Sequence, residues 1–216
     1  MQILTNKPLN RNFVEDRIRA YRFDIENYID RDRRFLTALK PLPVELNAPE
    51  IVKEMSANAR KANVGPMATV AGAIAEFLGR DLLKEGYREV IVENGGDIFL
   101  KITKVRAVGI YAGRSRLLSK LCLRVRPKDT PLGICTSSGT IGHSLSFGSA
   151  DSVVILSKSV SLADAVATAT GNLINSRKDL QRALDFARSI KGILGAVIIF
   201  RNNLATWGRI EFVEKI

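Results

Sequence analysis

The amino-acid sequence of 216 residues predicts an α+β fold in which helices pack on a mainly antiparallel sheet. Three observations indicate this fold. From residue 24 to Gly86, apolar residues recur at the spacing of helices, whereas directly after Gly86 they alternate with polar residues, as in strands. Short turns join the predicted strands, which is typical of antiparallel pairing. The chain closes with a predicted hairpin, whose turn is at residues 201–203.

The N-terminal part is predicted to be mostly helical. Residues 12–23 are interpreted as an exposed strand, and residues 24–39 as a helix that two prolines terminate. A second amphipathic helix is expected over residues 48–62. A third helix begins at Pro66 and ends at Gly86, because proline favours the first turn of a helix and glycine the position after it. This third helix is rich in Ala and Gly, so its backbone can approach a neighbour closely.

The rest of the chain is predicted to be mainly strands. We expect them at residues 89–93, 97–102, 106–111, 121–126, 131–136 and 152–156, followed by helices at 161–174 and 179–190 and hairpin strands at 195–200 and 204–213. We treat residues 1–216 as a single domain. Within it, residues 24–63 form an N-terminal helical part and residues 64–213 a core that carries the motifs.

Composition excludes several classes of protein. No apolar run approaches the roughly 20 residues that a membrane span needs, and no apolar block follows the polar N-terminus as in a secretory signal. We therefore expect a cytoplasmic protein that does not enter the membrane. Two cysteines are too few for a disulfide scaffold, and a single histidine excludes a His-rich metal site.

The net charge of +11 is concentrated in one segment. Between Ile98 and Lys128 there are nine Lys or Arg residues and no Asp or Glu. Such a segment attracts phosphate groups, although it can also be a solvated basic face. Because no aromatic residues are interleaved with the basic ones, nucleic acid is not the expected partner. We expect a small molecule that carries phosphate, and the sequence leaves open a homo-oligomer.

The segment 133–148 is dense in glycine and hydroxyl groups. Its backbone N–H groups and hydroxyls are suited to phosphate or carbonyl oxygens. The candidate binding residues are Thr136, Ser137, Ser138 and Gly139. Cys135 and His143, the only histidine, are candidates for nucleophilic catalysis, because a nearby histidine favours the thiolate. The alternative is that Cys135 is a small apolar residue of the core.

Asp164 and Thr168 lie four residues apart on a predicted helix and so share one face. A carboxylate and a hydroxyl on one face suit Mg²⁺, which prefers oxygen ligands. The alternative is that Asp164 only complements the helix dipole, since Ser161 is interpreted as the N-cap of this helix. The surrounding Ala, Val and Thr residues favour close packing, which places Asp164 near the interior.

Four motifs in this order resemble the ApbE-like family of uncharacterised proteins found in archaeal and bacterial anaerobes. They are Val64 to Ala68, Glu93 to Ile98 with the turn Asn94-Gly95-Gly96-Asp97, Cys135 to Gly148, and Leu162 to Thr168. The resemblance covers residues 24–213. It extends more distantly to the ApbE flavin transferases, which use Mg²⁺ to split FAD and attach FMN to a protein threonine, on an α+β fold of the T-fold type.

The resemblance implies a set of site residues. It assigns Mg²⁺ to Asp164, Thr168 and the backbone carbonyl of Ala68. It assigns FAD or FMN to the turn Asn94, Gly95, Gly96 and Asp97 and to Thr136, Ser137, Ser138 and Gly139. His143 resembles the histidine that follows this strand end in the transferases. One departure is that Ser-Leu-Ser-Phe follows His143, where the transferases have a His-x-x-Asp-Pro run.

We therefore expect a protein that binds a flavin or another phosphate-bearing cofactor with Mg²⁺ and acts as a flavin or nucleotidyl-type transferase. The basic residues of the segment 98–128 would assist at the phosphates. One alternative is a sulfur-transfer protein that uses Cys135, because the resemblance also implies a link with sulfide assimilation and homocysteine formation. A second alternative is a non-catalytic ligand-binding protein with a basic surface.

Overall fold

The computed structural model describes residues 1–111, 118–139 and 148–214. Its helices are α1 (Arg11–Arg31), α2 (Arg34–Thr37), α3 (Glu50–Ala62), α4 (Val70–Lys84), α5 (Val160–Asn172) and α6 (Leu180–Ser189). A short 3-10 helix, η1 (Pro66–Thr69), precedes α4. The strands are β1 (Gln2–Thr5), β2 (Val90–Asn94), β3 (Asp97–Lys101), β4 (Arg106–Gly109), β5 (Leu121–Val125), β6 (Leu132–Ser137), β7 (Ser152–Ser157), β8 (Ile193–Phe200), β9 (Asn203–Gly208) and β10 (Phe212–Glu214).

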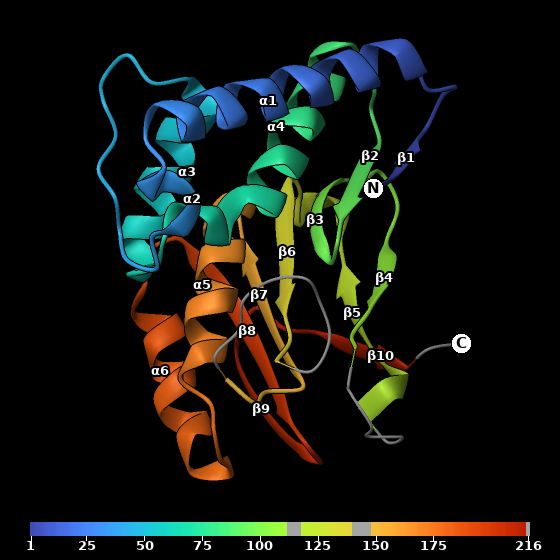
Figure 1. Ribbon diagram of the computed structural model, residues 1–216. Coiled ribbons are helices and arrows are strands. Elements are labelled where there is room, and N and C mark those ends of the chain that lie inside the picture. The colour runs from blue at the N-terminus through green and yellow to red at the C-terminus, as the bar shows by residue number, and fades with distance from the viewer. Residues whose placement is uncertain (112–117, 140–147, 215–216) are drawn as a thin grey trace.

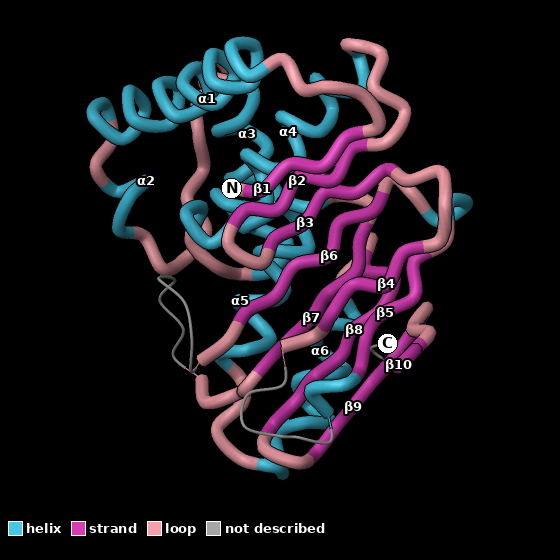
Figure 2. Tube along the Cα trace, turned by 90° about the vertical axis from the view of Figure 1, so that its right-hand side faces the viewer, coloured by secondary structure: helices cyan, strands magenta, loops and turns pink. Residues whose placement is uncertain are grey.

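Two sheets form within the described residues. The large sheet has the strand order β1-β2-β3-β6-β7-β8-β9, and the small sheet has the order β10-β5-β4. Every pair of neighbouring strands in both sheets is antiparallel. The helices cover one face of the large sheet, and the small sheet lies on the other side (Figures 1 and 2). The predicted α+β fold with a mainly antiparallel sheet is confirmed.

Side chains of the large sheet alternate between two cores. Cys135 and Ile155 belong to the core shared with the helices, whereas Ile134 and Leu156 belong to the core shared with the small sheet. This alternation follows from the two-residue repeat of a strand. A third cluster lies between α1, α2, α3 and α4 and includes Phe35, which is fully buried.

The region 12–23 is a correction to the sequence analysis, because it is helical and belongs to α1. Asn10 caps this helix by accepting a hydrogen bond from the backbone N–H of Phe13. The buried residues of α1 follow helical spacing and are Val14, Tyr21, Ile25, Tyr28 and Ile29. The interpretation as a strand was wrong because charged residues alternate with apolar ones locally, which imitates a two-residue repeat.

The C-terminal hairpin is a second correction. The segment 204–213, expected as one strand, is divided between β9 of the large sheet and β10 of the small sheet. Gly208, at the end of β9, has φ +87°, and a Cβ there would lie 2.3 Å from the carbonyl oxygen of Leu194. The chain therefore turns at a position that only glycine fits and continues into the other sheet.

No helix in the described part of the chain is both long enough and apolar enough to span a bilayer. The strand β1 was not expected from the sequence. It pairs with β2 at the edge of the large sheet, and its alternate side chains are exposed.

Candidate functional site

The start of α4 and the first half of α5 approach each other closely. Gly72, in the first turn of α4, donates its backbone N–H to Oδ2 of Asp164 on α5 at 2.9 Å. A Cβ at Gly72 would lie 2.8 Å from Cβ of Asp164 and 2.8 Å from the carbonyl oxygen of Val160. The glycine therefore permits the contact, and Asp164 satisfies an N–H group that the helix leaves unpaired.

The turn between β2 and β3 lies beside the same helix start. Asn94 donates its side-chain amide to the carbonyl oxygen of Ala71 at 3.1 Å, which ties the end of β2 to α4. Gly95 and Gly96 both have positive φ, as a tight hairpin turn requires. A Cβ on Gly96 would lie 3.8 Å from Thr136, so the turn is next to the end of β6. These contacts bring three of the predicted motifs together.

Asp97 follows the turn and pairs with Cys135 across β3 and β6. It is only 6% exposed, and the Cys135 thiol and the backbone N–H of Thr136 lie close enough to favour its ionised form, against the effect of burial. Its Oδ1 atom has no hydrogen-bond partner among the described residues. Since buried polar atoms are nearly always paired, this oxygen points to a ligand.

Both carboxyl groups have raised pKa values. Burial is the main cause, and it raises the pKa of Asp97 to about 7. Burial also raises the pKa of Asp164 well above its ordinary value, and the negative charge of Asp97 adds to this effect. The hydrogen bond from Gly72 acts in the opposite direction. Neither carboxyl group forms an ion pair with a basic residue in the described part of the chain.

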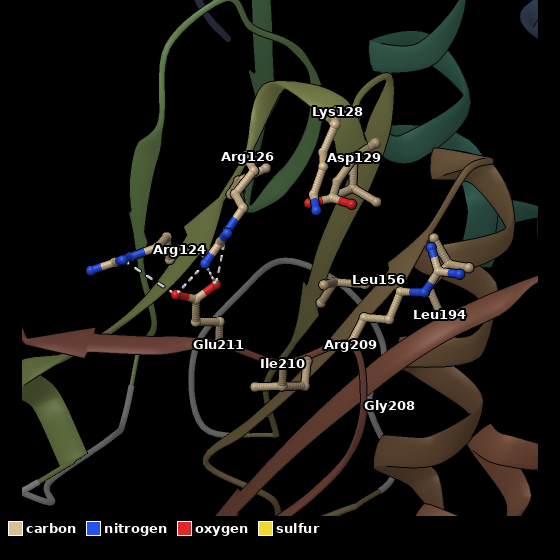
Figure 3. A pocket seen from close by; sticks show the side chains of 12 residues that line it. Arg124, Arg126, Lys128, Asp129, Leu156, Leu194, Gly208, Arg209, Ile210 and Glu211 are labelled. Atoms are coloured by element: carbon tan, nitrogen blue, oxygen red, sulfur yellow. Dashed lines mark hydrogen bonds and ion pairs between the residues drawn. The ribbon is translucent and has the colours of Figure 1, made fainter.

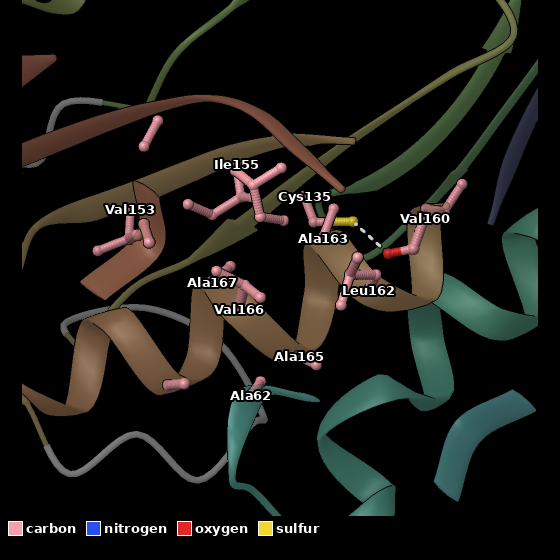
Figure 4. Close-up of a cluster of buried hydrophobic side chains, with 14 of the residues drawn as sticks. Ala62, Cys135, Val153, Ile155, Val160, Leu162, Ala163, Ala165, Val166 and Ala167 are labelled. Carbon is pink, nitrogen blue, oxygen red and sulfur yellow. Dashed lines mark hydrogen bonds between the residues drawn. The ribbon is translucent and has the colours of Figure 1, made fainter. Parts of the chain in front are cut away.

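Cys135 is fully buried in the core between the large sheet and α5 (Figure 4). Its Sγ lies 3.2 Å from the carbonyl oxygen of Val160, to which the thiol can donate. Burial and the charges of Asp97 and Asp164 raise the pKa of the thiol well above its ordinary value. This environment favours the protonated thiol and the interpretation of Cys135 as a small core residue. His143, proposed as its partner, lies outside the described residues.

The remaining predicted residues lie on the elements around this pair of carboxyl groups. Thr168 is one turn beyond Asp164 on α5 and is 9% exposed. Ala68 is in η1, which packs against α5. Ser137 ends β6, and Ser138 and Gly139 follow it. The backbone N–H of Gly139 donates to the carbonyl oxygen of Ala150 at 2.9 Å, so it is already paired.

The available donors fit a hard cation better than a soft one. No group of three or more His, Cys, Asp or Glu side chains suited to a metal ion occurs among the described residues. A carboxylate, a hydroxyl and a backbone carbonyl are oxygen donors, which Mg²⁺ prefers, and Mg²⁺ completes its coordination with water and phosphate oxygens.

Glu76 on α4 is a buried residue of this region that sequence reasoning missed. It is 1% exposed and accepts hydrogen bonds from the N–H of Ser161 and the hydroxyl of Ser159, each at 3.1 Å. It also pairs with Arg80 one turn later, a spacing that in the sequence is typical of a solvated helix surface. Its burial follows only from the packing of α4 on α5.

The capping residue of α5 is a correction. The expected N-cap, Ser161, lies inside the helix, and its hydroxyl has no partner among the described residues. Ser159 is the N-cap, because its side chain accepts a hydrogen bond from the N–H of Leu162. The helix begins earlier than the small-residue pattern indicated.

The basic segment requires a further correction. Arg124, Arg126 and Lys128 lie on or after β5 of the small sheet, on the side of the large sheet opposite the helices. For these three residues, the expectation that the basic segment assists at the phosphates near Asp164 is therefore wrong. Two other basic residues of the segment, Arg114 and Arg116, lie outside the described residues.

Comparisons with known proteins agree with this architecture. A family model described as AbpE bacteria matches residues 3–206. The UPF0280 protein of Methanocella arvoryzae is 44% identical over 200 residues, which are 93% of this chain and 81% of that protein. The UPF0280 protein of Methanosarcina acetivorans is 39% identical over 214 residues, which are 99% of this chain and 84% of that protein.

Two flavin transferases resemble the chain in structure. The flavin transferase ApbE from Vibrio cholerae has a TM-score of 0.58 at 14% identity, over 95% of this chain and 92% of that one. The flavinyl transferase ApbE of Pseudomonas stutzeri, in its apo form, has a TM-score of 0.57 at 14% identity, over 95% of this chain and 93% of that one. At this identity the likeness establishes the fold. The chain therefore belongs to the AbpE bacteria family and has the ApbE fold, as its motifs predicted.

Proposed function

We propose that this chain binds a flavin nucleotide, FAD or FMN, together with Mg²⁺ at the candidate functional site. The observation that carries the proposal is the pair of carboxyl groups of Asp97 and Asp164, which have no basic partner among the described residues. Isolating a carboxylate from water without a counter-charge is costly, so such groups take up either a proton or a cation. The ApbE fold supports a flavin nucleotide as the ligand that accompanies the cation.

The residues proposed to hold Mg²⁺ are Asp164, the hydroxyl of Thr168 and the backbone carbonyl of Ala68. The resemblance assigns these residues, and their oxygen atoms suit this ion. Bound Mg²⁺ would supply positive charge that neutralises the diphosphate of FAD. Gly72 would keep Asp164 directed towards the start of α4 through its N–H hydrogen bond.

The flavin nucleotide is proposed to lie along the turn at Asn94–Asp97 and the end of β6. Gly95 and Gly96 have no side chains, so a ligand can approach their backbone closely. Thr136 and Ser137 have hydroxyls that are suited to phosphate oxygens. The start of α4 adds the positive end of a helix dipole, which favours phosphate nearby. Support thus comes from sequence motifs that are distant along the chain and adjacent in space.

We extend the proposal to transfer of the FMN group. In such a reaction the diphosphate bond of FAD breaks, the FMN phosphoryl group joins the oxygen of an acceptor hydroxyl, and AMP leaves with the bridging oxygen. The acceptor hydroxyl loses its proton to a base. Binding and transfer are separable, because the first requires only the site described above and the second also requires an acceptor.

Titration of the purified chain with FAD tests the binding step, once in the presence of Mg²⁺ and once in the presence of EDTA. We expect binding that needs Mg²⁺ and is weakened about tenfold or more by Asp164→Asn, because that change removes the charge and keeps the shape. The matched control is Asp185→Asn, at an exposed carboxylate on α6. Absence of FAD and FMN binding in Mg²⁺, or equal binding by the Asp164 variant, would refute the proposal. Chromatography of AMP released from FAD tests the transfer step.

A further inference from the structure

A cavity opens on the face of the large sheet opposite the helices (Figure 3). It lies where the small sheet meets the large one, and its volume is about 470 Å³. Pockets for small molecules usually measure about 300–1,000 Å³. We call this cavity the basic groove. The proposed function makes no use of it.

The floor of the basic groove is apolar. Leu132 and Leu156 come from β6 and β7 and are largely buried, and Leu194 of β8 is partly buried beside them. Ile210 adds apolar surface from the segment that connects β9 to β10. Such a floor can pack against an aromatic ring or a short aliphatic chain, because apolar surface is removed from water in the contact.

The walls of the basic groove carry an excess of positive charge. Four basic residues, Arg124, Arg126, Lys128 and Arg209, face two acidic residues, Asp129 and Glu211, which leaves two positive charges in excess. Glu211 is bound at 2.8 Å by Arg126 and at 3.3 Å by Arg124. Lys128 and Arg209 form no ion pair with any residue that the structure describes. These two cations are therefore free to bind an anion.

Lys158 shows that positive charge accumulates next to the basic groove. Its Nζ donates to the backbone carbonyl oxygens of Asp129 at 2.6 Å and Pro131 at 3.0 Å. Burial and the charges of Arg209 and Lys101 lower the pKa of Lys158, although Asp129 acts in the opposite direction. An anion in the groove would relieve this repulsion.

The backbone around the basic groove is fixed before any ligand binds. The N–H of Arg209 donates to the carbonyl oxygen of Leu194 in the large sheet at 2.9 Å. The N–H of Arg124 donates to the carbonyl oxygen of Glu211 at 2.8 Å, which ties the same connection to the small sheet. In Figure 3, Leu156 lies between Arg126 on one side and Arg209 on the other. A ligand would thus find cations on both sides of an apolar floor that is already formed.

We propose that the basic groove is a binding site for a small organic anion, in which a phosphate or carboxylate contacts Lys128 and Arg209 and an apolar body packs on Leu132, Leu156 and Leu194. Both kinds of anionic group have the same chemistry toward lysine and arginine, although arginine pairs with either in a bidentate manner. The cavity is too small for a folded partner, and its apolar floor is of no use to inorganic phosphate alone. The site is independent of the proposed flavin site.

Calorimetric titration with phenyl phosphate tests this proposal. Inorganic phosphate and benzyl alcohol serve as probes of the anion and of the ring alone, and benzoate distinguishes carboxylate from phosphate. We expect phenyl phosphate or benzoate to bind about tenfold or more tightly than either partial probe, because only these molecules use both the charge and the apolar floor. Equal binding of phenyl phosphate, benzoate and both partial probes would overturn the proposal.

Variants of the two free cations locate the site. Lys128→Gln combined with Arg209→Gln should weaken binding about tenfold or more, and Lys178→Gln, an exposed lysine outside the groove, should leave it unchanged. Arg209→Lys should restore part of the affinity. Undiminished binding in the double variant would overturn the proposal. The Asp164→Asn variant should bind phenyl phosphate with full affinity. Weakened binding of phenyl phosphate by this variant would place the probe at the proposed flavin site instead.

Discussion

Replacing Asp97 with Asn should change how folding stability depends on pH in protein kept free of metal with EDTA. In the folded chain, burial raises the pKa of Asp97 to about 7 from its ordinary value of 3.8. Between these values the folded carboxyl keeps its proton and the unfolded one has lost it. The unfolded state then binds fewer protons, so the free energy of unfolding falls as the pH rises.

The size of this change in the free energy of unfolding follows from the interval between the two pKa values of Asp97. One such group contributes a slope of up to about 1.4 kcal/mol per pH unit, and so about 4 kcal/mol between pH 3.8 and about 7. This contribution is fully present below pH 3.8 and is lost by about pH 7. Asn cannot ionise and removes it. The variant should therefore gain about 3 kcal/mol relative to the wild type between pH 5 and pH 8.

Urea denaturation at pH 5 and pH 8, followed by circular dichroism, measures this difference. Asp185→Asn, at an exposed carboxylate, is the control and should show the wild-type dependence. The pKa of Asp164 is raised as well, partly by the charge of Asp97, so the difference between variant and wild type contains the contribution of Asp97 together with its coupling to Asp164. A difference that is the same at both pH values would refute the reasoning.

Three further predictions concern single residues. Gly72→Ala should lower the free energy of unfolding by about 1–3 kcal/mol in chemical denaturation, since its Cβ would lie 2.8 Å from Cβ of Asp164; unchanged stability would contradict the close helix contact. Glu76→Gln should lower the free energy of unfolding by about 1–3 kcal/mol in the same assay, because a buried hydrogen bond from the N–H of Ser161 to a carboxylate is lost. Unchanged stability would contradict a stabilising role of this hydrogen bond. Cys135→Ser should change the dissociation constant for FAD by no more than about twofold, because Cys135 is a buried core residue. Iodoacetamide should fail to label Cys135 in the native chain, which mass spectrometry measures. Rapid labelling would instead indicate a reactive thiolate.

The sequence predicted the fold class well because the change of hydrophobic repeat at Gly86 is a strong local signal. It predicted poorly where tertiary packing decides. Residues 12–23 have an ambiguous pattern, and only their contact with the helices beneath them makes the helical face evident. The break at Gly208 depends on the second sheet, which no local pattern indicates.

The motifs of the candidate site could be recognised in the sequence, but the contacts between them could not be predicted from it. The motifs around Asp97, Cys135 and Asp164 were identified, and the structure brings these three residues into one electrostatic cluster. The roles of Gly72 and Glu76 were missed, because a glycine in an Ala-rich helix and a Glu–Arg pair are common on their own. Arg124, Arg126 and Lys128 were misplaced because charge in a sequence carries no information about which face of a sheet receives it.

The most direct measurement is a crystal structure of the chain grown with FAD and Mn²⁺, which replaces Mg²⁺ and is located by its anomalous scattering. We expect one Mn²⁺ bound to Asp164, Thr168 and the carbonyl oxygen of Ala68, with the diphosphate of FAD beside it and the flavin nucleotide along the turn at Asn94–Asp97. Mn²⁺ on unrelated acidic residues, or FAD bound only in the basic groove, would contradict the proposed function.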